Sequence, residues 1–245
     1  MDATFPLVFL IAIAYSAVGH GGASGYLLVL ALLGSSPAQM APGALVLNLL
    51  VSGVAFITYR RAGYFVPGLF WPFALASVPA ALLGGMLEVP PQLYGWLLAA
   101  ALLFSALRLL GAGGRDGCAH SFSRPPLRLA LPIGAGIGFL SGLIGIGGGI
   151  FLSPVLILLR WADARRAAAA ASCFIWVNSL AALYGHSARN SLDAGQLLPL
   201  VLAAFLGGLI GSHLGARRFG GLALCRVLAA VMAIAAFKLL GRVMA

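Results

Sequence analysis

The sequence predicts an all-α integral membrane protein made of two inverted repeats, each with a glycine-broken re-entrant helical hairpin and three transmembrane helices. Three observations predict this fold: the composition, a repeated series of apolar runs, and the distribution of arginines between those runs. Hydrophobic residues make up 62% of the 245 residues and charged residues only 8%, whereas a soluble domain carries about 25% charged residues. Such a chain cannot cover itself with polar surface, so we expect it to lie in a lipid bilayer.

Eight uncharged runs follow one another along the chain, and most approach the roughly 20 residues that a helix needs to cross a bilayer. The first and fifth runs are the longest, and each is interrupted by a glycine-rich stretch, GHGGASG from Gly19 and GIGGGIF from Gly145. Glycine costs roughly 1 kcal/mol relative to alanine inside a helix, so we expect the helix to break at both stretches. The runs are Phe5–Leu33, Met40–Tyr59, Val66–Leu87, Leu93–Leu107, Leu129–Leu159, Ala167–Tyr184, Leu197–Ala216 and Phe219–Phe237.

Glycines and prolines of the two halves match at a nearly constant offset. The matches are Gly19, Gly21 and Gly22 with Gly145, Gly147 and Gly148 at an offset of 126 residues, and Gly68, Pro72 and Gly84 with Gly195, Pro199 and Gly211 at an offset of 127. One insertion reconciles the two offsets. The ordered matches favour a duplicated four-segment unit, with a first membrane repeat over residues 1–110, a polar linker over 111–127 and a second membrane repeat over 128–245.

The arginines indicate how the runs cross the bilayer. If all eight runs crossed, the basic loops would change side midway through the chain. If the two glycine-broken runs return to their own side as hairpins, twelve of the fifteen basic residues share one face, which the positive-inside rule makes cytoplasmic. Each half then has three crossings, so the second repeat is inverted, the linker is cytoplasmic and both termini lie outside. The twelve residues are Arg60, Arg61, Arg108, Arg115, Arg124, Arg128, Arg160, Arg165, Arg166, Arg217, Arg218 and Arg226, and the three opposite are Arg189, Lys238 and Arg242.

The predicted hairpins mark the expected functional site. Irregular backbone at membrane depth is tolerated only where protein or a water-filled cavity surrounds it. In inverted-repeat transporters such broken segments form the substrate site, and the N-termini of their half-helices favour anionic groups. The net charge of +10 arises from basic residues that lie singly or in pairs between apolar runs, so we expect no nucleic-acid partner.

The second half carries a family resemblance. The stretch GFLSGLIGIGGGIFLSPVLILL, from Gly138 to Leu159, and the following DARRAAAAAS, from Asp163 to Ser172, resemble the sulfite exporter TauE/SafE family of membrane transporters. The resemblance spans nearly the whole chain, because both halves carry a version, although the first half has His20 and GGASG in its place. It implies a secondary transporter, not an enzyme, that moves sulfite, an organosulfonate or a related small oxyanion across the bacterial inner membrane. We expect alternating access and no cofactor.

The acidic residues place limits on how transport is driven. All five, Asp2, Glu88, Asp116, Asp163 and Asp193, lie near segment ends or in loops. A carboxylate-based cation carrier or proton pump is therefore disfavoured. Coupling through a proton on His20, or through Na⁺ held by carbonyl groups, stays open. The three cysteines are far apart and form no CxxC pair, so we expect no metal site.

The candidate site residues are the turn glycines and the polar groups near them. His20 either donates to a substrate oxygen or titrates during transport, or it is a neutral core histidine. Ser24, Ser141, Asn48 and Asn178 either contact an anion or hold helices together. The substrate-binding candidates are Gly19, His20, Gly21, Gly22, Ser24, Asn48, Ser141, Gly145, Gly147, Gly148 and Asn178. His186 and His213 lie near segment ends, where we expect them at the membrane interface.

A rhomboid-like intramembrane serine protease is the alternative function. GASG, from Gly22 to Gly25, is similar to the rhomboid GxSG motif, with Ser24 as the nucleophile and His213 as its base. The second half has Ile150 or Phe151 where this serine should recur, so the duplication explains the glycines without catalysis. A transporter is therefore the favoured prediction.

Overall fold

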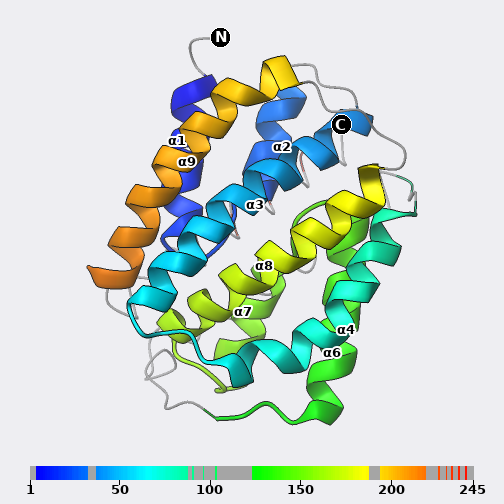
Figure 1. Cartoon of the computed structure of the whole chain (residues 1–245), viewed down its shortest axis with the longest axis vertical. Coiled ribbons are helices and arrows are strands. Elements are labelled where there is room, and N and C mark those ends of the chain that lie inside the picture. Colours follow the sequence, from blue (N-terminus) through cyan, green and yellow to red (C-terminus); the bar gives the residue numbers. More distant parts are fainter. Residues whose placement is uncertain are drawn as a thin grey trace.

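The computed structural model describes residues 4–32, 37–87, 123–187 and 194–218, together with isolated positions from 90 onward. Within these ranges the chain is helical (Figure 1). The predicted runs Leu93–Leu107 and Phe219–Phe237, and most of the predicted linker over 111–127, lie outside the described ranges. The helices are α1 (Thr4–Ser16), α2 (Ala23–Leu32), α3 (Pro37–Arg61), α4 (Pro67–Gly85), α6 (Leu127–Ile144), α7 (Gly149–Leu158), α8 (Ala164–Ser187) and α9 (Ala194–Arg217).

Among the described residues, five helices are long and apolar enough to cross a membrane, namely α3, α4, α6, α8 and α9. The chain is thus a multi-pass integral membrane protein, as its composition predicts. Helices α2 and α7 have ten residues each, which at 1.5 Å per residue gives about 15 Å, half the hydrocarbon thickness of a bilayer. Helix α1, with 13 residues, is also short of a full crossing.

The helices pack in pairs that join the two halves of the chain. Helix α1 lies against α9, α3 against α8, and α4 against α6, and Figure 1 shows these pairs side by side across the molecule. The short helices α2 and α7 pack on α3 and α8 respectively. The contacts made by one half correspond to contacts made by the other. The contact of α4 with α8 corresponds to that of α9 with α3, and the contact of α1 with α9 corresponds to that of α6 with α4.

The helix bounds follow the offsets of the glycine matches. Helices α2 and α7 have the same length and begin 126 residues apart, at Ala23 and Gly149. Helices α3 and α8 begin 127 residues apart, as do α4 and α9. The single insertion that the sequence requires therefore falls between the end of the short helix and the start of the next long one.

Glycines bring the paired helices into backbone contact. Gly84 on α4 faces the carbonyl of Phe139 on α6 so closely that a Cβ atom would collide with it, and Gly211 on α9 faces the carbonyl of Ile13 on α1 in the same way. Gly84 and Gly211 are one of the matched pairs in the sequence. Small residues at such contacts are typical of membrane helices, which gain little from burying one apolar side chain against another.

Arginines gather at one end of the helices. In Figure 1, α3 and α9 finish and α4, α6 and α8 begin in the lower half of the molecule, whereas α1 begins at the top. The described arginines at these ends are Arg60, Arg61, Arg128, Arg165, Arg166 and Arg217. The grouping of the basic helix ends agrees with the shared arginine face that the sequence predicts.

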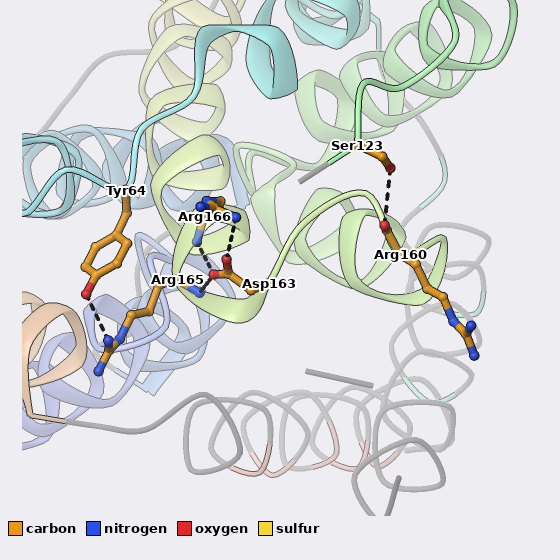
Figure 2. Close-up of polar contacts among 6 residues, drawn as sticks. All are labelled: Tyr64, Ser123, Arg160, Asp163, Arg165 and Arg166. Carbon is orange, nitrogen blue, oxygen red and sulfur yellow. Dashed lines mark hydrogen bonds and ion pairs between the residues drawn. The ribbon is translucent and has the colours of Figure 1, made fainter. Parts of the chain in front are cut away.

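The loop between α7 and α8 makes several polar contacts at the arginine-rich end of the helices (Figure 2). Asp163 accepts hydrogen bonds from the backbone amides of Arg165 and Arg166, at 3.0 and 2.9 Å, and so caps the N-terminus of α8. The Arg165 guanidinium donates to the Tyr64 hydroxyl at 2.8 Å, which links the second half to the first. Asp163 is thus used in a helix cap at a segment end and not at membrane depth.

Candidate functional site

The two glycine-rich stretches form turns that need glycine. Gly19 and Gly22 have φ angles of 75° and 95°, and Gly145, Gly147 and Gly148 have φ angles of 76° to 78°. Side chains other than glycine rarely adopt this left-handed region. The first turn ends α1 and starts α2, and the second ends α6 and starts α7. The packing of α2 back onto α1 shows in the hydrogen bond between Tyr15 and Ser24, whose hydroxyl oxygens lie 2.7 Å apart.

The two turns meet, although they lie more than a hundred residues apart in the sequence. His20 of the first turn donates from Nε2 to the carbonyl of Gly149, at the start of α7, over 2.9 Å. Because a carbonyl only accepts, Nε2 carries the proton in the neutral ring. The side chain is 2% exposed, and its other ring nitrogen, Nδ1, has no hydrogen-bond partner among the described residues.

Asn48 on α3 is held between the two turns. Its amide Nδ2 donates to the carbonyl of Ile146 at 3.1 Å and to the Ser179 hydroxyl at 3.0 Å. These bonds fix the orientation of the amide, and Oδ1 is buried without a partner among the described residues. A Cβ atom on Gly21 would collide with Oδ1, and one on Gly147 would collide with Nδ2. Asn48 thus contacts both turns at positions where neither tolerates a side chain.

A small cavity lies where these groups meet. It has room for about one water molecule. A larger ligand therefore requires the surrounding groups to move apart. Its lining consists of Tyr15, His20, Gly21, Gly22, Ala23, Ser24, Asn48, Ile146, Ile150 and Ile175.

Two helix N-termini border this cavity. The first amide of α2 with a backbone hydrogen bond in the described structure is that of Gly25, and the first of α7 is that of Phe151. The N-cap residue of α7, Gly148, makes no side-chain cap. Free amides and the helix dipole give each N-terminus about half a positive charge. The pair therefore offers an anion about one unit of positive charge without any lysine or arginine in the lining.

The other candidates lie around this centre or outside it. Gly19 lies against Ala168, and Gly145 lies against Ala41. Gly148 lies near Ser141, whose hydroxyl is buried without a hydrogen-bond partner in the described part of the chain. None of these four residues lines the cavity.

Asn178 has a structural arrangement of its own. It donates to the carbonyl of Phe174 at 2.9 Å and accepts from the Ser77 hydroxyl at 2.8 Å, which joins α8 to α4. Its neighbour Ser179 is the residue that bonds to Asn48. Asn178 is not part of the cavity lining.

Several lining residues were absent from the predicted site. Tyr15, Ile150 and Ile175 line the cavity, and Ser179 supports it. Tyr15 lies one helical turn before the first glycine turn, and this spacing could have placed it at the site from the sequence. His186 is buried and bonds through Nε2 to the carbonyl of Gly142 at 3.0 Å, because α8 packs beside α6; its position at the membrane interface stays a prediction.

The geometry gives no support to the protease alternative. The Ser24 hydroxyl is bonded to Tyr15 and not to a histidine. His213, the proposed base, lies exposed on α9. A nucleophile activated by a base needs hydrogen-bond contact between the two groups, and the described structure has no such contact for Ser24.

Comparison with known proteins agrees with the class of protein that the fold defines, a multi-pass membrane protein of α-helices around a buried cavity. Residues 4–239 match the family model "Sulfite exporter TauE/SafE", so the chain belongs to this family of membrane transporters, whose members are not enzymes. The chain is 37% identical over 234 residues to "Probable membrane transporter protein y4hK" of Sinorhizobium fredii, which covers 95% of both chains.

A shorter match adds to this comparison. Over 76 residues the chain is 33% identical to "Probable membrane transporter protein YunE" of Bacillus subtilis, which covers 31% of this chain and 28% of the relative. No solved structure matches the chain significantly. The family resemblance seen in the second half is therefore confirmed over nearly the whole sequence.

Asn48 and Asn178 form a matched pair for mutation. We expect Asn48→Ala and Asn178→Ala each to lower the free energy of unfolding by about 2 kcal/mol, because each leaves buried partners without hydrogen bonds. Only Asn48→Ala should also reduce the thermal stabilisation of the protein by a ligand that occupies the cavity. Equal weakening by both variants would show that Asn48 acts on stability alone.

Proposed function

We propose that this transporter moves a small oxyanion, such as sulfite or an organosulfonate, by alternating access through the cavity between the two glycine turns. The observation that carries the proposal is the meeting of the N-termini of α2 and α7 at one small cavity. Such a site suits a single negative charge. The lining contains no carboxylate that would bind a cation. The partnerless atoms His20 Nδ1 and Asn48 Oδ1 are hydrogen-bond acceptors in the neutral side chains, so the helix amides and the Tyr15 and Ser24 hydroxyls are the groups that can donate to an anion.

We infer that the two halves are inverted repeats, each with a re-entrant hairpin. The matching helix bounds and the matching contacts between α1 and α9 and between α6 and α4 support the duplication. The ten-residue lengths of α2 and α7 support hairpins, since neither helix spans a bilayer alone, whereas α6 is itself long enough to cross and makes the first arm of the second hairpin longer than the predicted half-membrane arm. In transporters built from inverted repeats, one half can rock against the other and so open the site to each side of the membrane in turn.

The closed packing on the arginine side supports a gate. Tyr59 donates from its hydroxyl to the carbonyl of Ala17 at 2.6 Å, just before the first turn. Tyr59, Ala168, Ala169 and Ala216 form a separate buried cluster there. This cluster lies where α3, α8 and α9 approach the end of α1, so it would have to separate for an anion to pass toward that side.

The experiment is a thermal-stability panel on the purified full-length protein. Sulfite, methanesulfonate, sulfate, acetate, Na⁺ and a neutral sulfone are titrated separately, because a ligand that binds only the folded state raises its stability by mass action. Stabilisation of several degrees by sulfite or a sulfonate, at constant ionic strength, is the expected result. Stabilisation by Na⁺ or the sulfone alone would contradict an anion site.

The orientation in the membrane gives a separate prediction. We propose that the protein lies in the bacterial inner membrane with its arginine-rich end and the 111–127 linker in the cytoplasm and both termini outside. In a variant that keeps Cys118 but has Cys173→Ser and Cys225→Ser, a membrane-impermeant thiol reagent should label Cys118 only after permeabilisation. Ready labelling of intact cells would contradict the hairpin topology, and a cysteine placed at Ala3 serves as the accessible control.

A further inference from the structure

The cavity is lined by residues at matching positions in the two halves. His20 matches Ile146, and Ser24 matches Ile150, both at the offset of 126 residues that relates α2 to α7. Asn48 matches Ile175 at the offset of 127 that relates α3 to α8. All six residues line the same cavity. The cavity therefore lies where equivalent parts of the two halves meet, and each half contributes one wall.

The two walls differ in chemistry. The first half contributes hydroxyl, imidazole and amide groups from Tyr15, His20, Ser24 and Asn48, whereas every lining residue of the second half is an isoleucine. The three isoleucines are buried, at 1% to 4% exposure. At each of the three matched positions, the first half thus has a polar residue and the second half has an isoleucine.

An anion with oxygens on all sides does not fit this arrangement well. Oxygens turned toward the isoleucine side chains, away from the amides at the start of α7, would lose their water and gain no hydrogen bond, which is costly for any polar group. An oxyanion with one small aliphatic substituent can place its oxygens on the polar wall and its substituent on the isoleucines. A hydrophobic pocket gains roughly 10- to 200-fold in discrimination for each methyl-sized group that it encloses.

We propose that Ile146, Ile150 and Ile175 are specificity-determining residues, which select an oxyanion with a small aliphatic substituent over a bare oxyanion of the same charge. The proposal rests on the proposed function, because it assigns the anion to this cavity. It goes beyond that function by assigning the discrimination between anions to the isoleucine wall of the cavity. The polar side chains of the first half and the N-termini of α2 and α7 hold the charge, and the isoleucine side chains contact the group on the opposite side of the anion.

The test compares two anions of equal charge on the purified full-length protein. Methanesulfonate carries a methyl group on the sulfur atom where hydrogensulfite carries only a hydrogen or a lone pair, and a mildly acidic buffer keeps sulfite in its singly protonated form. We expect methanesulfonate to bind about tenfold more tightly by calorimetry. Ile150→Ser, which restores the residue of the matching position, should reduce this ratio to about one or reverse it.

A matched control separates specificity from packing. Ile157→Ser places the same change in the same helix at a buried residue outside the cavity lining, and it should leave the ratio unchanged. If Ile150→Ser fails to fold, Ile150→Ala and Ile175→Val remove part of the aliphatic wall and should lower the ratio in proportion. Each ratio is taken within one variant, so a general loss of stability does not alter it.

The outcomes distinguish this proposal from the proposed function. Hydrogensulfite binding as tightly as methanesulfonate to the wild type would overturn the proposal while leaving an anion site in place. So would equal ratios in the Ile150 and Ile157 variants. Binding of neither anion would overturn the proposed function and the specificity assignment with it.

Discussion

Gly147→Ala is expected to cause a large loss of stability. Gly147 has a φ angle of 76°, where an alanine is strained by about 1–2 kcal/mol. The added Cβ would also collide with Asn48 Nδ2 and lie 2.6 Å from the Ser179 hydroxyl oxygen, so the bond between these residues would break. Together these effects should lower the free energy of unfolding by at least ~3 kcal/mol, measured by thermal melting in detergent.

Gly136→Ala is the control for this change. Gly136 lies in α6, and a Cβ atom there would meet nothing within 4 Å. Because alanine favours a helix more than glycine does, the variant should melt at or above the wild-type temperature. Equal melting temperatures for the Gly147 and Gly136 variants would contradict the assigned turn geometry. Gly21→Ala should behave like Gly147→Ala, since its Cβ would collide with Asn48 Oδ1.

His20→Leu should abolish transport with a much smaller effect on folding. The substitution removes the bond to the Gly149 carbonyl and the partnerless acceptor Nδ1 from a residue that lines the cavity. We expect anion flux to fall at least about 100-fold, as when a group that contacts the ligand is lost. His20→Gln keeps a hydrogen-bond donor and removes titration. It should keep part of the downhill flux if the role of His20 is its bond to the Gly149 carbonyl, and lose uphill transport if His20 carries a coupling proton on Nδ1.

His186→Leu is the matched control for His20→Leu. His186 is also buried and bonds through Nε2 to a glycine carbonyl, that of Gly142, but it does not line the cavity. The two leucine variants should therefore lose similar stability, while only His20→Leu loses transport. Normal transport by His20→Leu would remove His20 from the site and leave it as a packing residue.

The sequence was informative about the fold because its signals are local and periodic. Hydrophobic runs, breaks at glycine and basic loops each act within a few residues, so the long helices and the two breaks were predicted. The offsets of 126 and 127 also predicted where equivalent helices begin. The full crossing length of α6, at 18 residues, was not anticipated from a run that had been read as two half-membrane arms.

The site was only partly predictable, because its contacts join distant segments. The bond between His20 and Gly149 depends on how the two halves dock, which no local pattern reports. Asn48 and Asn178 are both single asparagines in apolar helices. The orientation of α3 directs Asn48 to the cavity and Ser179, whereas the orientation of α8 directs Asn178 to Ser77. The isoleucine wall was also missed, since an aliphatic residue in an apolar helix carries no signal of its own.

The most direct test of the central claim is flux through the reconstituted full-length protein. Vesicles with and without protein take up isotopically labelled sulfite or methanesulfonate, with Na⁺ and a neutral sulfone as comparison solutes. If the cavity between the two turns carries a small oxyanion, uptake of at least one of the two anions should depend on protein, saturate, persist in His186→Leu and vanish in His20→Leu. Protein-dependent movement of Na⁺ or the sulfone, with no movement of either anion, would contradict it.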